Sequence, residues 1–276
     1  MTDLAVEASD LELGYGAGLV LAASSFVVPM GGITAVIGPN GSGKSTLLNA
    51  IAGLIEPLAG HLRVPAHAKG LHRISYVLQS TKVSDHLPIS VGEVVAMGRY
   101  AHLGPLGRLG QKDRDAIADA MERTGIVAIR DRQIQELSGG QRQRAFVAQG
   151  LAQEHDLLLL DEPLSAVDIT TAHAIDEVIH EEKQRGCTVI LTTHDLSEAS
   201  VADHVLLLAG RVIASGPPHE VLTGPNLAAA YGPAVLHLNQ SGMFIDDHAH
   251  RPAASRHVHG ERSIHPEAAP GDLHVD

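Results

Sequence analysis

The chain has 276 residues, enough for one large domain, and 44% of them are hydrophobic, so a sizeable core can form. The formal net charge of -12 argues against a general nucleic-acid binder, because phosphate backbones attract an excess of Lys and Arg. The single cysteine, Cys187, fits a reducing compartment. No run reaches the roughly 18 apolar residues of a membrane span, and the acidic start lacks the basic region of a signal peptide. We therefore expect a soluble chain that reaches a membrane only through a partner.

Residues 1–80 are predicted to form strands around a single helix. Apolar runs separated by glycine pairs, LELGYGAGLVL, SFVVP and GITAVIG, indicate several short strands. The pattern then changes to a helix over residues 42–54, and a further strand is expected over residues 73–78. Between residues 89 and 147, helix formers recur with the spacing of a helix, which indicates a separate helical lobe.

Strands and helices alternate between residues 156 and 216. The apolar runs DLLLL, CTVILTT, HVLLLAG and RVIASG are interleaved with the helical patterns TAHAIDEVIHEEKQRG and LSEASVAD. This alternation is typical of a parallel sheet covered by helices on both faces, so the expected fold class is α/β. The pattern weakens after residue 223, and small, polar and histidine residues from about residue 239 indicate a flexible tail.

A phosphate-binding motif follows the apolar strand ITAVI and precedes a helix. The segment GPNGSGKST fits G-x-x-x-x-G-K-[ST]. Its glycines allow a tight turn whose N–H groups face phosphate oxygens, Lys44 can reach the outer phosphates, and the Ser45 hydroxyl can bind Mg2+. A glycine-rich turn with an incidental Lys-Ser is the alternative, but the full pattern in this context favours a nucleoside triphosphate site. The predicted binding residues are Gly38, Pro39, Asn40, Gly41, Ser42, Gly43, Lys44, Ser45 and Thr46.

Two adjacent carboxylates end the apolar strand DLLLL. We expect Asp161 to hold Mg2+ through water and Glu162 to orient and polarise the attacking water as the general base. A simple helix N-cap would also place acidic residues after a strand. The phosphate motif upstream favours the catalytic interpretation.

The string LSGGQ distinguishes among the many protein classes that use a phosphate motif. It opens a helix shortly before the acidic strand, where free N–H groups and a serine hydroxyl can bind phosphate oxygens. Taken alone, Ser-Gly-Gly is equally well explained as an ordinary loop before a capped helix. The residues concerned are Ser138, Gly139, Gly140 and Gln141.

Over about residues 3–225, the chain resembles the ATP-binding subunits of ABC transporters in the identity, order and spacing of these motifs. The resemblance makes LSGGQ the family's signature sequence. It implies that Tyr15 stacks on adenine and that Gln79 touches Mg2+ and links the site to the membrane subunits. It also implies that Asp168 lies in a loop crossing a dimer interface and that His194 contacts the terminal phosphate. The simpler alternatives are a surface turn residue, a loop cap, a helix cap and a solvated histidine, respectively.

The resemblance further implies the domain organisation and the partners. Residues 3–236 would form an ABC ATPase domain, with a P-loop NTPase core, an N-terminal antiparallel β subdomain and a helical subdomain at about residues 85–150. Residues 237–276 would form a flexible histidine-rich tail. The ATPase would act as a homodimer, each ATP lying between the phosphate loop of one chain and the signature helix of the other. It would lie on the cytoplasmic face of the membrane, with multi-span permease subunits and an extracytoplasmic substrate-binding protein as partners.

The cargo is indicated by two segments. Residues 87–109 resemble the branch of the family that imports zinc and manganese, and more distantly the branch for iron chelates. The tail carries two His-x-His pairs, and neutral imidazole suits zinc better than hard cations. Together these segments favour zinc; a manganese or iron-chelate importer, or a soluble ABC-type ATPase such as one in iron–sulfur cluster assembly, is the alternative. An amphipathic lobe segment and a polar tail with only unspecific metal binding are the simpler interpretations. The expected tail ligands are His248, His250, His257 and His259.

Overall fold

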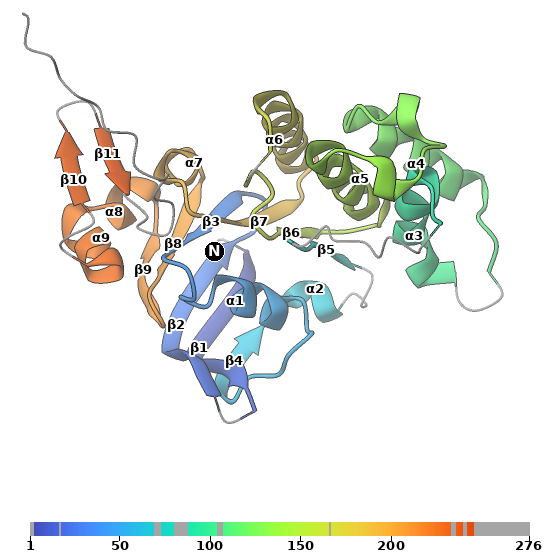
Figure 1. Cartoon of the computed structure of the whole chain (residues 1–276). Coiled ribbons are helices and arrows are strands. Elements are labelled where there is room, and N and C mark those ends of the chain that lie inside the picture. The colour runs from blue at the N-terminus through green and yellow to red at the C-terminus, as the bar shows by residue number, and fades with distance from the viewer. Residues whose placement is uncertain are drawn as a thin grey trace, which may run out of the picture. The chain divides into compact units, whose positions relative to one another are not determined.

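A six-stranded sheet with the order β5-β6-β7-β3-β8-β9 forms the central layer of the fold (Figure 1). The computed structural model describes residues 3–16, 18–68, 73–79, 88–103, 107–165, 167–232, 236–239 and 242–245. Every strand pair in the sheet is parallel except β8 with β9, so the predicted, mainly parallel α/β core is confirmed. The strands are β3 (Ile33–Ile37), β5 (Ile74–Val77), β6 (Leu157–Leu160), β7 (Thr188–Thr193), β8 (His204–Leu208) and β9 (Val212–Gly216).

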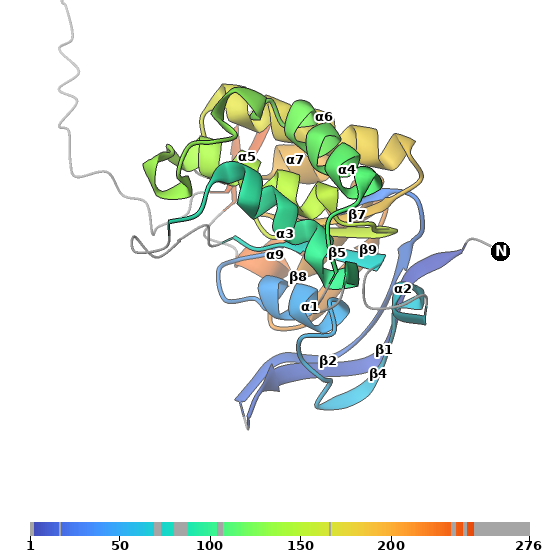
Figure 2. The same cartoon turned by 90° about the vertical axis from the view of Figure 1, so that its right-hand side faces the viewer.

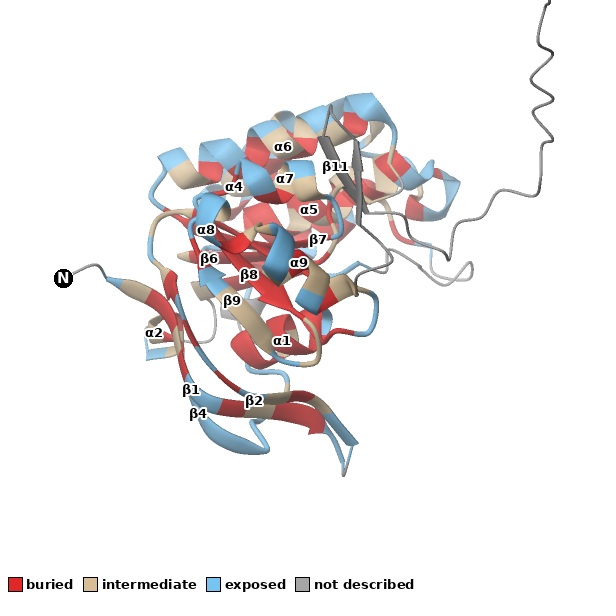
Figure 3. Ribbon diagram, turned by 90° about the vertical axis from the view of Figure 1, so that its left-hand side faces the viewer, coloured by how far each residue is buried: buried red, intermediate tan, exposed pale blue. Residues whose placement is uncertain are grey.

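Both faces of this sheet are buried, which explains why its strands appear in the sequence as continuous apolar runs. Alternate residues of β6 face opposite sides. Leu158 and Leu160 belong to one hydrophobic cluster, and Leu157 and Leu159 belong to another. The first cluster also takes in α5 (Gly139–Ala152) and α6 (Ile169–Gln184), and the second takes in α1 (Lys44–Ile51). Figure 3 shows the buried residues concentrated on the central strands.

A three-stranded antiparallel sheet with the order β2-β1-β4 packs against α1 (Figure 2). The sequence pattern predicted several short strands here, but the structure has two strands of 12 residues each, joined as a hairpin. Tyr15 pairs with Gly18, and Gly16 has a φ of 58°, so the glycines form the hairpin end instead of breaking the strands. The predicted N-terminal antiparallel subdomain is therefore confirmed, with longer strands. Its strands are β1 (Leu4–Tyr15), β2 (Gly18–Pro29) and β4 (Ala59–Arg63).

Three helices that pack against one another form the helical lobe predicted between residues 89 and 147 (Figure 1). Val95, Ile117 and Ala148, one from each helix, share a hydrophobic cluster with one face of the central sheet. The lobe is therefore packed onto the core. Its helices are α3 (Val91–Leu103), α4 (Gln111–Arg123) and α5, with short 3-10 helices at Val127–Ile129 and Ile134–Glu136.

The C-terminal part holds a helix that the sequence pattern did not predict. Helix α9 follows residue 223, where the periodicity weakens, yet it buries Leu227 and Ala230. None of the helices in the described part of the chain is both long and apolar enough to cross a bilayer. The remaining helices are α2 (Pro65–Ala68), α6, α7 (Leu196–Ser200), α8 (Pro218–Val221) and α9 (Gly224–Tyr231).

The segment predicted to be the tail overlaps a small two-stranded antiparallel sheet. Its strands are β10 (Leu236–Asn239) and β11 (Gly242–Ile245), and they fall on either side of residue 240. The tail histidines His248, His250, His257 and His259 lie outside the described residues.

Candidate nucleotide-binding site

Predicted site residues follow the carboxyl ends of four parallel strands of the central sheet. The phosphate loop follows β3, Gln79 follows β5, the acidic pair Asp161 and Glu162 follows β6, and His194 follows β7. Strand β7 lies between β3 and β6, so the phosphate loop and the acidic pair flank its end. The carboxyl ends of parallel strands are the usual place for a ligand in an α/β sheet.

The phosphate loop turns sharply before α1. Gly41 and Gly43 have φ values of 77° and 102°, a region that residues with side chains rarely adopt. A Cβ at Gly38 would lie 2.1 Å from the carbonyl oxygen of Leu208 and 2.8 Å from Ser42 Oγ, so only glycine fits there. The structure therefore accounts for all three glycines of the motif.

Lys44 is a buried cation at the start of α1. Its Nζ donates to the carbonyl oxygens of Gly38 at 2.9 Å and of Pro39 at 3.3 Å. Burial lowers the pKa of Lys44, and the nearby carboxylates of Glu162 and Asp161 oppose this shift. The ammonium group therefore lies within electrostatic reach of both predicted catalytic carboxylates.

The loop has the features that phosphate and Mg2+ require. Ser42 Oγ is buried and has no hydrogen-bond partner among the described residues. Asn40, Gly41 and Ser45 are exposed, and a Cβ at Gly41 would meet no atom within 4 Å, whereas Thr46 is buried. An unpaired hydroxyl, an open loop rim and a helix N-terminus together fit a bound anion and its metal ion.

Thr192, near the end of β7, holds both acidic residues. Its Oγ1 donates to Asp161 Oδ1 at 2.6 Å and accepts from the Glu162 amide at 2.8 Å. Thr192 is fully buried and Asp161 is 5% exposed, so these bonds form away from water, where they are strong. Glu162 has a φ of 48°, a strained conformation for this residue, and the bond to its amide helps to hold it there.

The Glu162 side chain is oriented by two donors. Gln79 Nε2 donates to Glu162 Oε2 at 2.7 Å, and Ser165 Oγ donates to the same oxygen at 3.1 Å. The structure thus brings Gln79 and Glu162 together, although their positions in the chain are far apart. Within the described part of the chain both bonds use Oε2, which leaves Oε1 as the acceptor for a water molecule.

Ser138 and Asp168 both cap helices, as their simpler interpretations predicted. Ser138 Oγ accepts from the Gln141 amide at 3.3 Å, and Gln141 Oε1 accepts from the Ser138 amide at 3.2 Å, which closes a capping box at the start of α5. Asp168 accepts from both the amide and the hydroxyl of Thr171 at 2.9 Å, and these bonds lower the pKa of Asp168. Capping uses only part of these groups, because Ser138 and Asp168 remain exposed.

The starts of α5 and α6 are in contact at Gly140. A Cβ on this residue would lie 2.6 Å from Thr171 Oγ1 and 2.8 Å from Asp168 Oδ2. The signature segment and the loop before α6 therefore form one surface, on which Gly139 is also exposed.

Tyr15 and His194 occupy exposed positions. Tyr15 ends β1, is 54% exposed, and its hydroxyl accepts from Asn49 Nδ2 of α1 at 3.1 Å. This bond places the ring beside the helix that begins at the phosphate loop. His194 is exposed directly after β7, next to Asp195, which caps α7.

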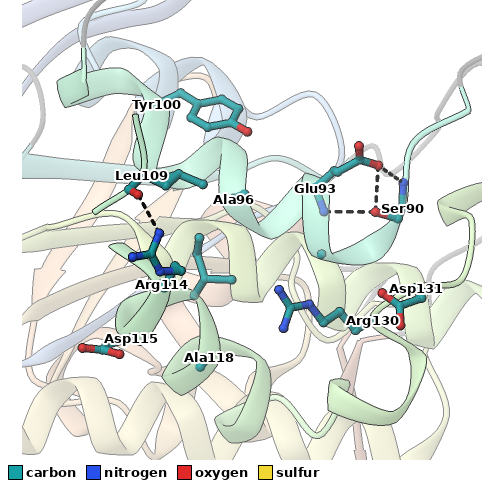
Figure 4. A pocket seen from close by; sticks show the side chains of 12 residues that line it. Ser90, Glu93, Ala96, Tyr100, Leu109, Arg114, Asp115, Ala118, Arg130 and Asp131 are labelled. Atoms are coloured by element: carbon teal, nitrogen blue, oxygen red, sulfur yellow. Dashed lines mark hydrogen bonds between the residues drawn. The ribbon is translucent and has the colours of Figure 1, made fainter. Parts of the chain in front are cut away.

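A separate pocket of about 710 Å3 lies in the helical lobe (Figure 4). Half of its lining residues belong to residues 87–109, the segment that indicated the cargo. The amide and hydroxyl of Ser90 donate to Glu93 Oε2 at 2.8 and 2.7 Å, which lowers the pKa of Glu93 and caps α3. The pocket is lined by Ser90, Gly92, Glu93, Ala96, Tyr100, Leu109, Arg114, Asp115, Ile117, Ala118, Arg130 and Asp131.

Sequence reasoning missed Thr192 and Ser165. Thr192 could have been found, because a hydroxyl in a strand that is buried throughout needs a hydrogen-bond partner. Ser165 carries no such signal, since it follows the acidic strand in a loop of mixed composition.

Known proteins are similar to this chain over most of its length. A family model described as ABC transporter matches residues 21–165. The chain is 43% identical over 234 residues to the zinc transport system ATP-binding protein of Treponema pallidum, and this alignment covers 84% of this chain and 88% of that protein. It is 41% identical over 228 residues to the manganese transport system ATP-binding protein of Synechocystis sp., with coverage of 80% and 88%. The chain belongs to the ABC transporter family.

This ABC ATPase also shares its fold with solved structures. An inward-facing ABC transporter, described as of the metal-chelate type, matches with a TM-score of 0.73 and 28% identity over 88% of this chain and 96% of that chain. The family resemblance and the P-loop NTPase fold predicted from the motifs are therefore confirmed, and the chain is an ATPase of this family.

Proposed function

We propose that this ABC ATPase hydrolyses ATP to drive the import of a divalent metal ion, with zinc as the favoured cargo. The observation that carries the proposal is the arrangement of Lys44, Gln79 and Glu162, which come together at the carboxyl ends of the parallel strands. The chain that carries this site is 41% and 43% identical to ATP-binding proteins named for manganese and zinc transport.

Binding of the nucleotide would depend on the phosphate loop. Lys44 and the amides of residues 38–46 would hold the phosphates, and Tyr15 would provide the surface for adenine. Mg2+, held by Ser45, Gln79 and Asp161, would supply positive charge next to the terminal phosphate. Thr192 keeps Asp161 oriented for this role through its 2.6 Å bond.

Hydrolysis would depend on Glu162. Ser165 holds Oε2 of its carboxylate, and Gln79 shares that oxygen before Mg2+ binds, so that Oε1 can accept the proton of an attacking water. His194, exposed at the end of β7, would donate to the terminal phosphate. Gln79 changes partners in this scheme, from Glu162 to Mg2+, and so would couple nucleotide binding to the orientation of the base.

The working unit would be a homodimer. Ser138, Gly139 and Asp168 form an exposed surface, and Ile169 beside them is 78% exposed. A large exposed apolar side chain next to the exposed capping residues Ser138 and Asp168 fits burial against a second copy of the chain. Each ATP would then be enclosed by the phosphate loop of one chain and the signature helix of its partner.

The lobe pocket would receive a segment of the membrane permease. Its floor combines apolar groups such as Tyr100 and Leu109 with charges from Glu93, Arg114 and Asp131, which suits an amphipathic helix end. Tyr100 is 51% exposed there. Contact at this pocket would place the ATPase at the cytoplasmic face of the membrane, and an extracytoplasmic binding protein would deliver the cargo to the permease.

Zinc, manganese and a metal chelate are all supported by the names of similar proteins, and the two His-x-His pairs of the tail favour zinc. The decisive experiment is growth of a strain lacking this ATPase, with zinc, manganese or iron depleted one at a time. We expect the strain to grow poorly under zinc depletion. The intact chain should restore growth, and the Glu162→Gln variant should not. A defect under manganese or iron depletion alone would reassign the cargo.

A soluble ABC-type ATPase, as in iron–sulfur cluster assembly, is the second candidate. Purification of the tagged chain from detergent-solubilised membranes distinguishes the two. A transport ATPase should co-purify with a multi-span membrane protein, and loss of that partner on Tyr100→Glu substitution would support docking at the pocket. Purification without any membrane partner would contradict transport.

A further inference from the structure

His155, Glu182 and Cys187 form a buried cluster at the amino-terminal ends of the parallel strands, whereas the phosphate loop lies at their carboxyl ends. His155 lies between α5 and β6, Glu182 lies in the last turns of α6, and Cys187 directly precedes β7. Their potential ligand atoms, one from each residue, all lie within 4.8 Å of one another. The side chains of His155 and Glu182 are 5% and 6% exposed, and Cys187 is 5% exposed.

Hydrogen bonds orient the two ligand atoms that face each other. His155 Nδ1 lies 2.7 Å from the carbonyl oxygen of Gln153, so Nδ1 carries a hydrogen, and Nε2 points at Glu182 Oε2 at 3.0 Å. A histidine that binds a metal through one ring nitrogen commonly donates the other N–H to a carbonyl in this way. Arg123 donates to Glu182 Oε1 at 2.6 Å, which leaves Oε2 directed at the cluster.

The dimensions of the cluster suit a tetrahedral metal ion. Zinc bonds of about 2.0 Å to nitrogen and oxygen and about 2.3 Å to sulfur separate the ligand atoms by roughly 3.5 Å. The Nε2 to Oε2 separation is 3.0 Å, and no pair exceeds 4.8 Å, so small side-chain movements would bring these three of the four tetrahedral ligands to bonding distance. A thiolate beside imidazole and carboxylate selects zinc-like ions over manganese or magnesium.

A divalent ion would take the place of two protons in the cluster. His155 Nε2 faces Glu182 Oε2 at 3.0 Å, and the Cys187 thiol donates to the Thr188 carbonyl oxygen at 3.4 Å. Loss of the protons on Nε2 and on the thiol would offset the two positive charges that the ion brings.

We propose that His155, Glu182 and Cys187 bind one thiophilic divalent transition-metal ion, for which Zn2+ is the best match. This site is distinct from the nucleotide site, and it depends on neither the cargo nor the tail. The ion would tie the ends of α5 and α6 to the start of β7. The same two helices begin at Ser138 and Asp168, so metal binding would stiffen the far ends of the elements that form the predicted dimer surface.

Titration of the purified full-length chain with Co2+ tests the site. Because Cys187 is the single cysteine, a thiolate-to-cobalt charge-transfer band can arise only there, and the tail histidines cannot produce it. We expect the band to saturate at one Co2+ per chain and to disappear when Zn2+ is added. Mg2+ and Mn2+ should leave it unchanged.

Two variants identify the other ligands. His155→Gln and Glu182→Gln should each weaken Co2+ binding at least about tenfold, whereas His180→Gln, on the exposed surface of α6, should not. Absence of the band in the native chain, or an unchanged affinity in both variants, would leave a purely structural ion pair and overturn the proposal. If the variants do not fold, X-ray absorption of the zinc-loaded native chain decides, because a first shell without sulfur also excludes the site.

Discussion

The hydrogen bonds of Thr192 lead to a prediction that measurements of unfolding free energy and of ATP turnover can both test. Thr192→Val preserves the shape of the side chain but removes the hydroxyl that donates to Asp161 Oδ1 and accepts from the Glu162 amide. The bond to a charged carboxylate contributes about 1.5–3 kcal/mol and the neutral bond about 1 kcal/mol. Both partners are left without this hydroxyl, so we expect the free energy of unfolding to fall by about 3 kcal/mol.

Thr188→Val is the matched control at the other end of the same strand. The Thr188 hydroxyl is also buried, but among the described residues it makes one neutral bond, accepted from the Gly31 amide at 2.9 Å. Its loss should cost about 1 kcal/mol. Urea denaturation of both nucleotide-free variants should therefore separate them by about 2 kcal/mol.

The two variants should differ even more in ATP turnover. Without Thr192, the Asp161 carboxylate and the strained Glu162 backbone lose their common anchor, and displacement of reacting groups by about 1 Å can cost a hundredfold in rate. Thr188→Val should retain near-native turnover in a steady-state phosphate-release assay. Equal losses of stability in the two variants, together with equal turnover, would refute the anchoring role of Thr192.

Three further predictions concern charge. Lys44→Ala should weaken ATP binding, measured by titration calorimetry, by about 10- to 100-fold; unchanged affinity would remove Lys44 from the site. Glu162→Gln should bind ATP but lower turnover at least about a hundredfold and accumulate as an ATP-bound dimer in size-exclusion chromatography, and near-native turnover would exclude Glu162 as the base. Burial raises the pKa of Asp203, but hydrogen bonds from the Ile33 amide and Lys183 outweigh it and lower that pKa. Its stabilising contribution is therefore present above about pH 4 and lost on acidification, so Asp203→Asn should be less stable than the native chain at pH 7 and the difference should shrink below pH 4 in urea titrations.

The sequence by itself determined the elements whose causes are local. The phosphate loop is recognisable because its glycines, Lys44 and Ser45 act within a few residues of one another, between a strand and a helix. The strands of the parallel sheet were equally clear, since burial on both faces demands continuous apolar runs such as Leu157–Leu160. Ser138 and Asp168 could be predicted as helix caps for the same reason, because a cap bonds only three residues ahead.

Only the tertiary structure decided which of these segments meet. Gln79 reaches Glu162 because β5 and β6 are neighbours in the sheet, and Thr192 reaches Asp161 because β7 lies next to β6, contacts that no local pattern contains. The buried cluster of His155, Glu182 and Cys187 has the same origin, since it combines two helix ends and a strand start. Pairing across strands and burial of side chains depend on the whole packed chain, and that is why the second, metal-binding candidate site became visible only in three dimensions.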